Sequence, residues 1–143
     1  MAEDKLFFVG QKAFINKNGK LLVLRDPDYA VDGDVGLDFP GGKIQIGELD
    51  LPEALRREVR EETSLEIEIR ELFVTWYNEF PEHHRNAGKK VFFVGYRCKY
   101  KSGDVTLSHE HNSYRWVNRN DYHEVDDKSK FFDALEQYFC KTQ

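Results

Sequence analysis

Between residues 41 and 65, four carboxylates follow a glycine turn in an order that could hold a divalent metal ion against a diphosphate. Glu48 comes first, and Glu58, Glu61 and Glu62 follow together in one short run. Hard cations such as Mg²⁺ and Mn²⁺ prefer oxygen ligands and keep part of their water shell, which suits glutamates bridged to substrate phosphate. These residue types therefore point to metal-assisted phosphate chemistry.

A helix is expected to position the last three carboxylates. Asp50 can cap its N-terminus, Pro52 fits its first turn, and no further Pro or Gly interrupts the chain through Ser64. At about 100° per residue, the apolar stripe of this helix is formed by Leu51, Leu55 and Val59. Glu62 projects into the sector of that stripe. Carboxylates at the edge of a core repel one another and resist desolvation, so they need cations, hydrogen bonds or protons nearby.

The same run of charges also allows a simpler interpretation. RREVREE can be a solvated helix face with opposite charges four residues apart, of which Arg57 and Glu61 are one pair. The preceding segment favours the metal site over this alternative. A Pro-Gly-Gly turn at 40–42 ends a short apolar strand and leads through Lys43 to Glu48.

Residues 42–65 resemble the Nudix box, G-x5-E-x7-R-E-U-x-E-E-x-G-U, in which U is a bulky aliphatic residue. The fixed positions of that box are occupied by Gly42, Glu48, Arg57, Glu58, Val59, Glu61, Glu62 and Leu65. There are two departures, because eight residues instead of seven separate Glu48 from Arg57, and Ser64 stands at the last glycine position. The extra residue, taken as Leu49, lengthens the loop before the helix. A serine in the left-handed turn after the helix should cost about 1 kcal/mol.

The resemblance implies a role for each of these residues. Nudix proteins hydrolyse a nucleoside diphosphate linked to another moiety, by metal-assisted attack of water on phosphorus. One to three Mg²⁺ or Mn²⁺ ions would be held by the Gly41 carbonyl, Glu58, Glu61, Glu62 and Glu110. Glu61 or Glu110 would take the proton from water. Arg57 would pair with Glu48 or Glu61, and Glu48 would brace the loop against the helix.

A second polar cluster, Leu-Ser-His-Glu-His at 107–111, precedes the strand-like run Tyr-Arg-Trp-Val. This segment is similar to one in diadenosine tetraphosphate hydrolases, and Nudix proteins often use a Glu from such a loop as a metal ligand or general base. The resemblance therefore implies that role for Glu110, whereas the alternative is a surface residue in a turn. A zinc site is a further alternative, and it would use His83, His84, His109 and His111.

The polar stretch at 78–90, NEFPEHHRNAGKK, is expected to form a mobile loop that covers the substrate. Tyr77, Phe80 or Arg85 would then contact the base or a phosphate of the substrate. Lys43 would supply positive charge to the phosphates. Aromatic side chains in this stretch can equally be packed against the end of a strand.

Length and composition predict one compact domain over residues 1–143. A net charge of −5 argues against a general nucleic-acid surface, because polyanion binding normally needs a basic face. No apolar run is long enough to span a bilayer, and the N-terminus lacks the features of a signal peptide, so a cytoplasmic protein without membrane contact is expected. Cys98 and Cys140 lie in apolar sequence and are expected to be buried thiols rather than a disulfide.

Strands and helices are expected to alternate around the box. Strand-like runs lie at 6–15, 21–25, 37–39, 66–77, 91–100, 105–107 and 114–117. The first two should form a hairpin around Asn18-Gly19. A closing amphipathic helix is traced by Phe131, Phe132, Leu135, Tyr138 and Phe139. Such a chain belongs to the α/β class, and the resemblance implies the Nudix fold, an α/β/α sandwich with a mixed β-sheet between helices.

Two other functions remain compatible with such a fold. A catalytically silent Nudix domain would bind a nucleotide as a sensor, but it would be expected to have lost box carboxylates. An isomerase of isoprenoid diphosphates would be expected to carry a catalytic cysteine in a longer chain, and neither cysteine here lies in such a motif. The hydrolase interpretation leaves the substrate open among dinucleoside polyphosphates, ADP-ribose and nucleoside triphosphates. Since dimers are common in the family, a homodimer is one assembly to test.

Overall fold

The computed structural model describes residues 4, 6–28, 36–80, 82, 84 and 87–141. The strands are β1 (Phe8–Lys17), β2 (Lys20–Arg25), β3 (Leu37–Asp38), β4 (Gly41–Lys43), β5 (Glu66–Glu79), β6 (Lys90–Ser102) and β7 (Ser113–Val117). The helices are α1 (Leu51–Thr63), the 3₁₀ turn η1 (Tyr122–Val125) and α2 (Lys130–Lys141). The strands form a mixed sheet in the order β3-β2-β1-β6-β5, in which β4 also pairs with β1 and β7 also pairs with β2. β1 and β6 run parallel.

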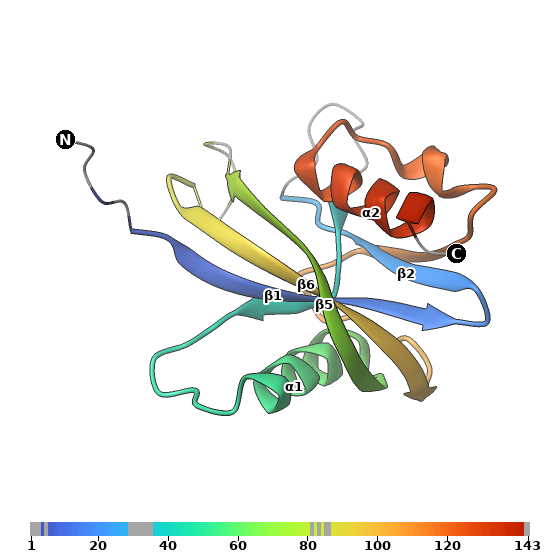
Figure 1. The fold of residues 1–143 in the computed structure, drawn as a ribbon, viewed down its shortest axis with the longest axis horizontal. Helices are drawn as coiled ribbons and strands as arrows, with labels where there is room; N and C mark the ends of the chain where they lie inside the picture. The colour runs from blue at the N-terminus through green and yellow to red at the C-terminus, as the bar shows by residue number, and fades with distance from the viewer. Residues whose placement is uncertain are drawn as a thin grey trace.

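The helices α1 and α2 cover opposite faces of this sheet (Figure 1). Successive side chains of a strand point to opposite faces, so β1 contributes to two cores. Phe14 packs in the core under α2, whereas Ala13 and Ile15 pack in the core under α1. The first core is rich in aromatic rings, and Phe14 stacks on Phe39 with 4.2 Å between the ring centroids. The arrangement confirms the predicted α/β/α sandwich.

The hairpin between β1 and β2 forms where the sequence predicts it. Lys17 pairs with Lys20 across the two strands. The turn residues Asn18 and Gly19 have φ values of 54° and 83°. A two-residue turn with positive φ at both positions twists in the same sense as the strands, and Asn-Gly tolerates that conformation best.

Helix α1 begins and ends close to the predicted residues. Its cap, Asp50, accepts a hydrogen bond from the Glu53 amide at 3.1 Å. Ser64 follows the helix with a φ of 66°, as expected for the glycine position that it occupies. The prediction for Leu51 is wrong, because this side chain is 37% exposed. The Leu51 carbonyl instead accepts a hydrogen bond from Gln11 at 3.0 Å, so the first turn of α1 makes a polar contact with β1.

The segment predicted as a strand at 105–107 is not a strand, because it pairs with the end of a helix. The Thr106 amide donates to the Thr63 carbonyl at 2.9 Å, and the Ser108 amide donates to the Glu62 carbonyl at 3.1 Å. These amides supply partners for the last carbonyls of α1, which have none within the helix. The segment thereby attaches the loop after β6 to the C-terminal end of α1.

Two further differences from the sequence predictions concern Cys140 and the turn η1. Cys98 is buried as predicted, but Cys140 is exposed, and both are free thiols. The turn η1 was not predicted, since it is too short to show a helical period.

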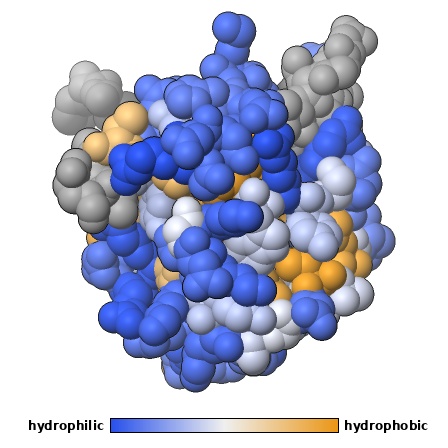
Figure 2. All heavy atoms as spheres, turned by 90° about the vertical axis from the view of Figure 1, so that its right-hand side faces the viewer, coloured by the Kyte–Doolittle hydropathy of each residue, from blue (hydrophilic) through white to orange (hydrophobic). Residues whose placement is uncertain are grey.

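None of the described helices is long and apolar enough to cross a membrane. The face on the right-hand side of Figure 1 is mostly hydrophilic, with smaller hydrophobic areas among the polar ones (Figure 2).

Candidate active site

A cavity of about 380 Å³ is lined by residues of the strands β1, β3, β4 and β6, of both helices α1 and α2, and of the loops between them. The charged side chains that line it include Lys12, Asp38, Lys43, Glu58, Glu62 and Glu110. The aromatic side chains that line it are Phe80, Phe93 and Phe131. The lining therefore offers both charged groups and aromatic rings that a planar apolar group could contact.

The Pro-Gly-Gly turn brings the backbone of β4 against both β1 and α1. Gly41 has a φ of 141°, and a Cβ atom at this position would collide with the carbonyl oxygen of Gln11. A Cβ atom at Gly42 would lie 2.7 Å from Glu58 Oε2. Glycine is therefore required at Gly41, where a side chain would meet backbone, whereas at Gly42 a side chain would displace the Glu58 carboxylate.

Glu62 and Glu58 are the two helix carboxylates that reach the cavity. Glu62 is 5% exposed and accepts a hydrogen bond from the Gly41 amide at 3.0 Å. Burial raises the pKa of Glu62 to about 8, although the Lys12 ammonium nearby opposes the rise. Burial also raises the pKa of Glu58, which Arg57 opposes. A bound cation would offset this cost of desolvation and favour the ionised carboxylates.

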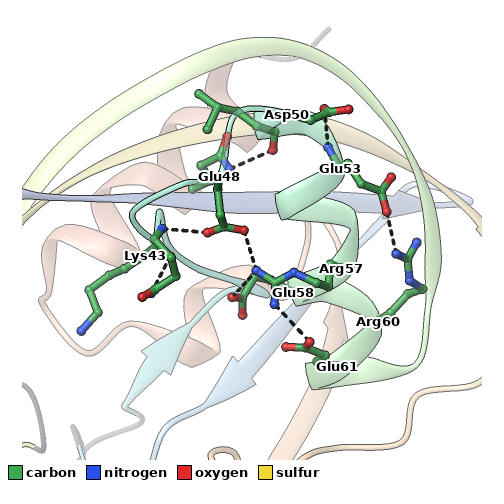
Figure 3. A network of polar contacts seen from close by, with 11 residues as sticks. Lys43, Glu48, Asp50, Glu53, Arg57, Glu58, Arg60 and Glu61 are labelled. Carbon is green, nitrogen blue, oxygen red and sulfur yellow. Dashed lines mark hydrogen bonds and ion pairs between the residues drawn. The ribbon is translucent and has the colours of Figure 1, made fainter.

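Arg57 joins the loop before α1 to the helix itself (Figure 3). Its guanidinium lies 2.6 Å from Glu48 Oε2 and 3.1 Å from Glu61 Oε1. Glu48 Oε1 also accepts a hydrogen bond from the Gln45 amide at 2.7 Å. The inserted Leu49 is exposed, so the longer loop places it in solvent without preventing Glu48 from reaching Arg57. This confirms the predicted pairing of Arg57 with Glu48 and Glu61.

A buried charged cluster that the sequence did not predict lies in the wall of the cavity. Lys12 Nζ is 3.0 Å from Asp38 Oδ1, and His111 Nε2 is 2.8 Å from Asp38 Oδ2. Burial alone would raise the pKa of Asp38, but Lys12 and His111 hold it below its usual range. The pKa of His111 is raised, because the bond to Asp38 outweighs the effect of burial. The signal in the sequence was Lys12 directly before the apolar run Ala13 to Ile15.

A second buried pair joins two loops beside the cavity. His84 Nε2 lies 3.0 Å from Asp26 Oδ2, and both side chains are buried. The His84 ring stacks on Phe80 with 4.5 Å between the centroids. His84 therefore packs in the structure, although the sequence interpretation placed it in a mobile polar loop. Both rings line the cavity, so Phe80 and His84 of the 78–90 stretch contribute to its lining.

Comparison with known proteins agrees with this geometry. Residues 12–135 match the NUDIX domain. The chain belongs to the Nudix family. The MutT protein from Methanosarcina mazei is 27% identical, with a TM-score of 0.75 over 98% of this chain and 97% of that chain. A NUDIX hydrolase from Nitrosomonas europaea is 17% identical, with a TM-score of 0.73 over 96% of this chain and 92% of that chain.

A third similar structure is an ADP-ribose pyrophosphatase from Streptococcus suis. It is 20% identical, with a TM-score of 0.57 over 80% of this chain and 75% of that chain. The fold that this chain shares with these structures agrees with its membership of the Nudix family.

The structure brings together six of the residues predicted for the Nudix site. The cavity is lined by Gly41, Lys43, Glu58, Phe80, Glu62 and Glu110. Glu48, Arg57 and Glu61 are not among the lining residues, and Glu61 is exposed and paired with Arg57. Tyr77 is also elsewhere, since Lys130 Nζ lies 3.7 Å from its ring centroid. Arg85 lies outside the described residues.

The donors around the cavity of this Nudix domain suit a hard divalent cation. Glu58, Glu62 and Glu110 present carboxylate oxygens, and Gly41 adds backbone groups to the same wall. Within the described part of the chain, no three His, Cys, Asp or Glu side chains form a ready metal cluster. His84 and His111 bind separate carboxylates, which does not agree with the zinc alternative, and His83 lies outside the described residues. An ion that keeps water and shares phosphate oxygens fits this donor set.

Proposed function

We propose that the cavity binds a nucleoside diphosphate linked to another moiety and hydrolyses a phosphoanhydride bond in it. The observation that carries the proposal is the buried Glu62 carboxylate beside Glu58 in the wall of an open cavity. Burial disfavours the ionised form of both carboxylates, and a bound cation would stabilise that form and meet a phosphate entering from solvent. The family membership of the chain supports the same reaction class.

In this proposal the Gly41 carbonyl, Glu58, Glu62 and Glu110 hold Mg²⁺ or Mn²⁺. Such an ion neutralises phosphate charge and lowers the pKa of bound water. Glu61, predicted as a further ligand, remains with Arg57, and this pair together with Glu48 braces the loop before α1. Lys12 and Lys43 line the same cavity and add positive charge for the phosphates.

The reaction proposed is a displacement at phosphorus. A water oxygen forms a bond to one phosphorus atom, and the bond from that phosphorus to the bridging oxygen breaks. The second phosphate leaves with the bridging oxygen, and Glu110 accepts the proton of the attacking water. Glu110 is favoured over Glu61 for this role because Glu110 lines the cavity, whereas Glu61 does not. A general base must lie within reach of the proton that it takes.

The aromatic lining supports a substrate with a planar base. Phe80, Phe93 and Phe131 line the cavity, and aromatic rings stack favourably on nucleobases. The Leu-Ser-His-Glu-His segment favours dinucleoside polyphosphates, whereas ADP-ribose is suggested by the pyrophosphatase from Streptococcus suis. We therefore propose that the substrate is a nucleoside diphosphate derivative. Direct assay must identify which one.

The test is product analysis with diadenosine tetraphosphate, ADP-ribose, NADH, dNTPs and 8-oxo-dGTP, each with Mg²⁺ or Mn²⁺. Glu62→Gln should abolish the turnover seen with wild type. Glu53→Gln is the matched control, because Glu53 lies on the same helix but pairs with Arg56 and Arg60 outside the cavity. Wild-type turnover that survives Glu62→Gln would refute the assignment.

The same experiment separates the two rival functions. Nucleotide binding in isothermal titration, without turnover of any compound, would favour the silent sensor. Conversion of isopentenyl diphosphate would favour the isomerase.

A further inference from the structure

The Asp38 clamp, meaning Asp38 with its buried partners Lys12 and His111, joins three segments that are far apart in the sequence. Asp38 ends β3 just before the Pro-Gly-Gly turn, Lys12 lies within β1, and His111 lies in the loop that leads to β7. Lys12 also donates to the Phe39 carbonyl at 3.1 Å, and the Phe39 amide donates to Asp38 Oδ1 at 2.8 Å. One carboxylate therefore connects the start of the glycine turn to a separate loop.

That loop, residues 108–112, carries Glu110. Its ends are held by backbone hydrogen bonds, from the Ser108 amide to the Glu62 carbonyl and from the Asn112 amide to the Arg25 carbonyl. Between these ends, His111 is the only buried residue, whereas Glu110 is exposed. Among the described residues, His111 Nδ1 has no hydrogen-bond partner, so the bond from Nε2 to Asp38 is the polar contact that fixes the ring.

The bond between His111 and Asp38 affects the orientation of the neighbouring Glu110 side chain. An exposed carboxylate in a loop can rotate through several rotamers, and each rotation of the loop backbone changes where it points. A buried imidazole bonded to a carboxylate restricts the backbone beside it, because carboxylate–histidine bonds fix ring orientation. Asp38 is itself held by Lys12 and by the Phe39 amide, so it provides a fixed acceptor.

We propose that His111 is a positioning residue, which holds the 108–112 loop through its bond to Asp38 so that the Glu110 carboxylate faces the cavity. The inference rests on the proposed function, in which Glu110 accepts the proton of the attacking water. The inference adds that the orientation of Glu110 depends on the bond between its neighbour His111 and Asp38 of β3. His111 itself need not touch the substrate.

The first test measures the loop directly and needs no substrate. Hydrogen–deuterium exchange of the EDTA-treated protein is followed in peptides that cover 105–115. His111→Ala should increase exchange there, and His111→Gln should restore it, because the glutamine amide can donate to Asp38 from a similar distance. His109→Ala is the matched control, since His109 is exposed in the same loop. Unchanged exchange in His111→Ala would overturn the inference whatever the substrate is.

The second test links the loop to turnover through a double-mutant cycle of His111→Ala and Glu110→Gln. His111→Ala should lower kcat about tenfold to a hundredfold without a matching change in KM. The double variant should have a kcat within about twofold of Glu110→Gln alone, because His111 acts through Glu110. The assay uses the panel compound that wild type hydrolyses fastest.

The outcomes of the cycle separate the inference from the proposed function. If the effects of the two substitutions on kcat multiply, His111 does not act through Glu110 and the inference fails, while the role of Glu110 stands. If Glu110→Gln has wild-type kcat, the proposed role of Glu110 fails first, and the inference fails with it. If His111→Ala does not fold, His111→Phe replaces it, because phenylalanine fills the buried volume without the hydrogen bond.

Discussion

Replacing Glu62 by Gln should make the metal-free protein more stable at alkaline pH while it removes activity. Glu62 is almost fully buried, and burial raises its pKa from 4.5 to about 8. The folded protein therefore holds this proton up to about pH 8, whereas the unfolded chain releases it near pH 4.5. Because the folded state binds more protons in this window, the free energy of unfolding falls as pH rises through it. Gln carries no titrating proton and keeps an acceptor for the Gly41 amide.

The size of the effect follows from the change in pKa. One pKa unit corresponds to about 1.4 kcal/mol, so the rise from 4.5 to about 8 sets a ceiling of roughly 5 kcal/mol. Relaxation of the site and entry of water reduce the penalty for a buried ion, and we expect about 3 kcal/mol. For a chain of this length, that difference should raise Tm by roughly 6–12 °C.

The assay is thermal and urea denaturation of EDTA-treated wild type and Glu62→Gln at pH 5 and pH 9. Other titrating groups are shared by the two proteins, so the difference between the variants reports on residue 62. The two should be about equally stable at pH 5, and Glu62→Gln should be the more stable at pH 9. Glu53→Gln is the control, because that carboxylate is exposed and its removal should bring no alkaline gain.

Addition of Mg²⁺ at pH 8 provides the complementary result. A ligand that binds only the folded state raises its stability, so wild type should gain more than Glu62→Gln. The kcat of Glu62→Gln should fall by at least about a hundredfold. A stability difference that is the same at pH 5 and pH 9 would refute the view that Glu62 is a desolvated carboxylate awaiting a cation.

Three further substitutions test the box. Gly42→Ala should lower kcat at least about tenfold with the fold retained, because its Cβ would displace Glu58, and an unchanged circular dichroism spectrum with normal kcat would contradict this. Ser64→Gly should raise the free energy of unfolding by about 1 kcal/mol in urea titrations, because φ there is 66°. Arg57→Lys should lower kcat in steady-state assays, since lysine cannot bind Glu48 and Glu61 together, and full activity would exclude the bracing role.

Much of the architecture was predictable because it depends on local interactions. The Asp50 cap, the Asn18-Gly19 turn and the left-handed Ser64 each follow from a few neighbouring residues. The pairing of Arg57 with Glu48 was also predictable, since both lie within the box. Segment 105–107 shows the limit, because its apolar residues Val105 and Leu107 pack in the core under α1 without forming a ladder, while the amides of Thr106 and Ser108 bond the helix end.

The Asp38 clamp could not be predicted in the same way. Its members come from β1, β3 and the loop before β7, and no spacing in the sequence connects them. Each residue alone has an ordinary explanation, since a single Lys, Asp or His is usually solvated. Only the packing of three distant segments excludes water from all of them, and exclusion of water is what makes their mutual bonds strong.

The sequence by itself indicated the family, because residues 42–65 resemble the Nudix box, and it predicted the helix that carries the carboxylates of that box. Helix periodicity placed Glu62 in the sector of the apolar stripe, and the tertiary structure decided that Glu58 and Glu62 line the cavity whereas Glu61 does not. Glu61 and Glu62 are neighbours in one helix, yet Glu61 is exposed beside Arg57 and Glu62 is buried against Gly41. A step of about 100° along the helix separates solvent from core, and only the position of α1 against the sheet determines where that boundary lies.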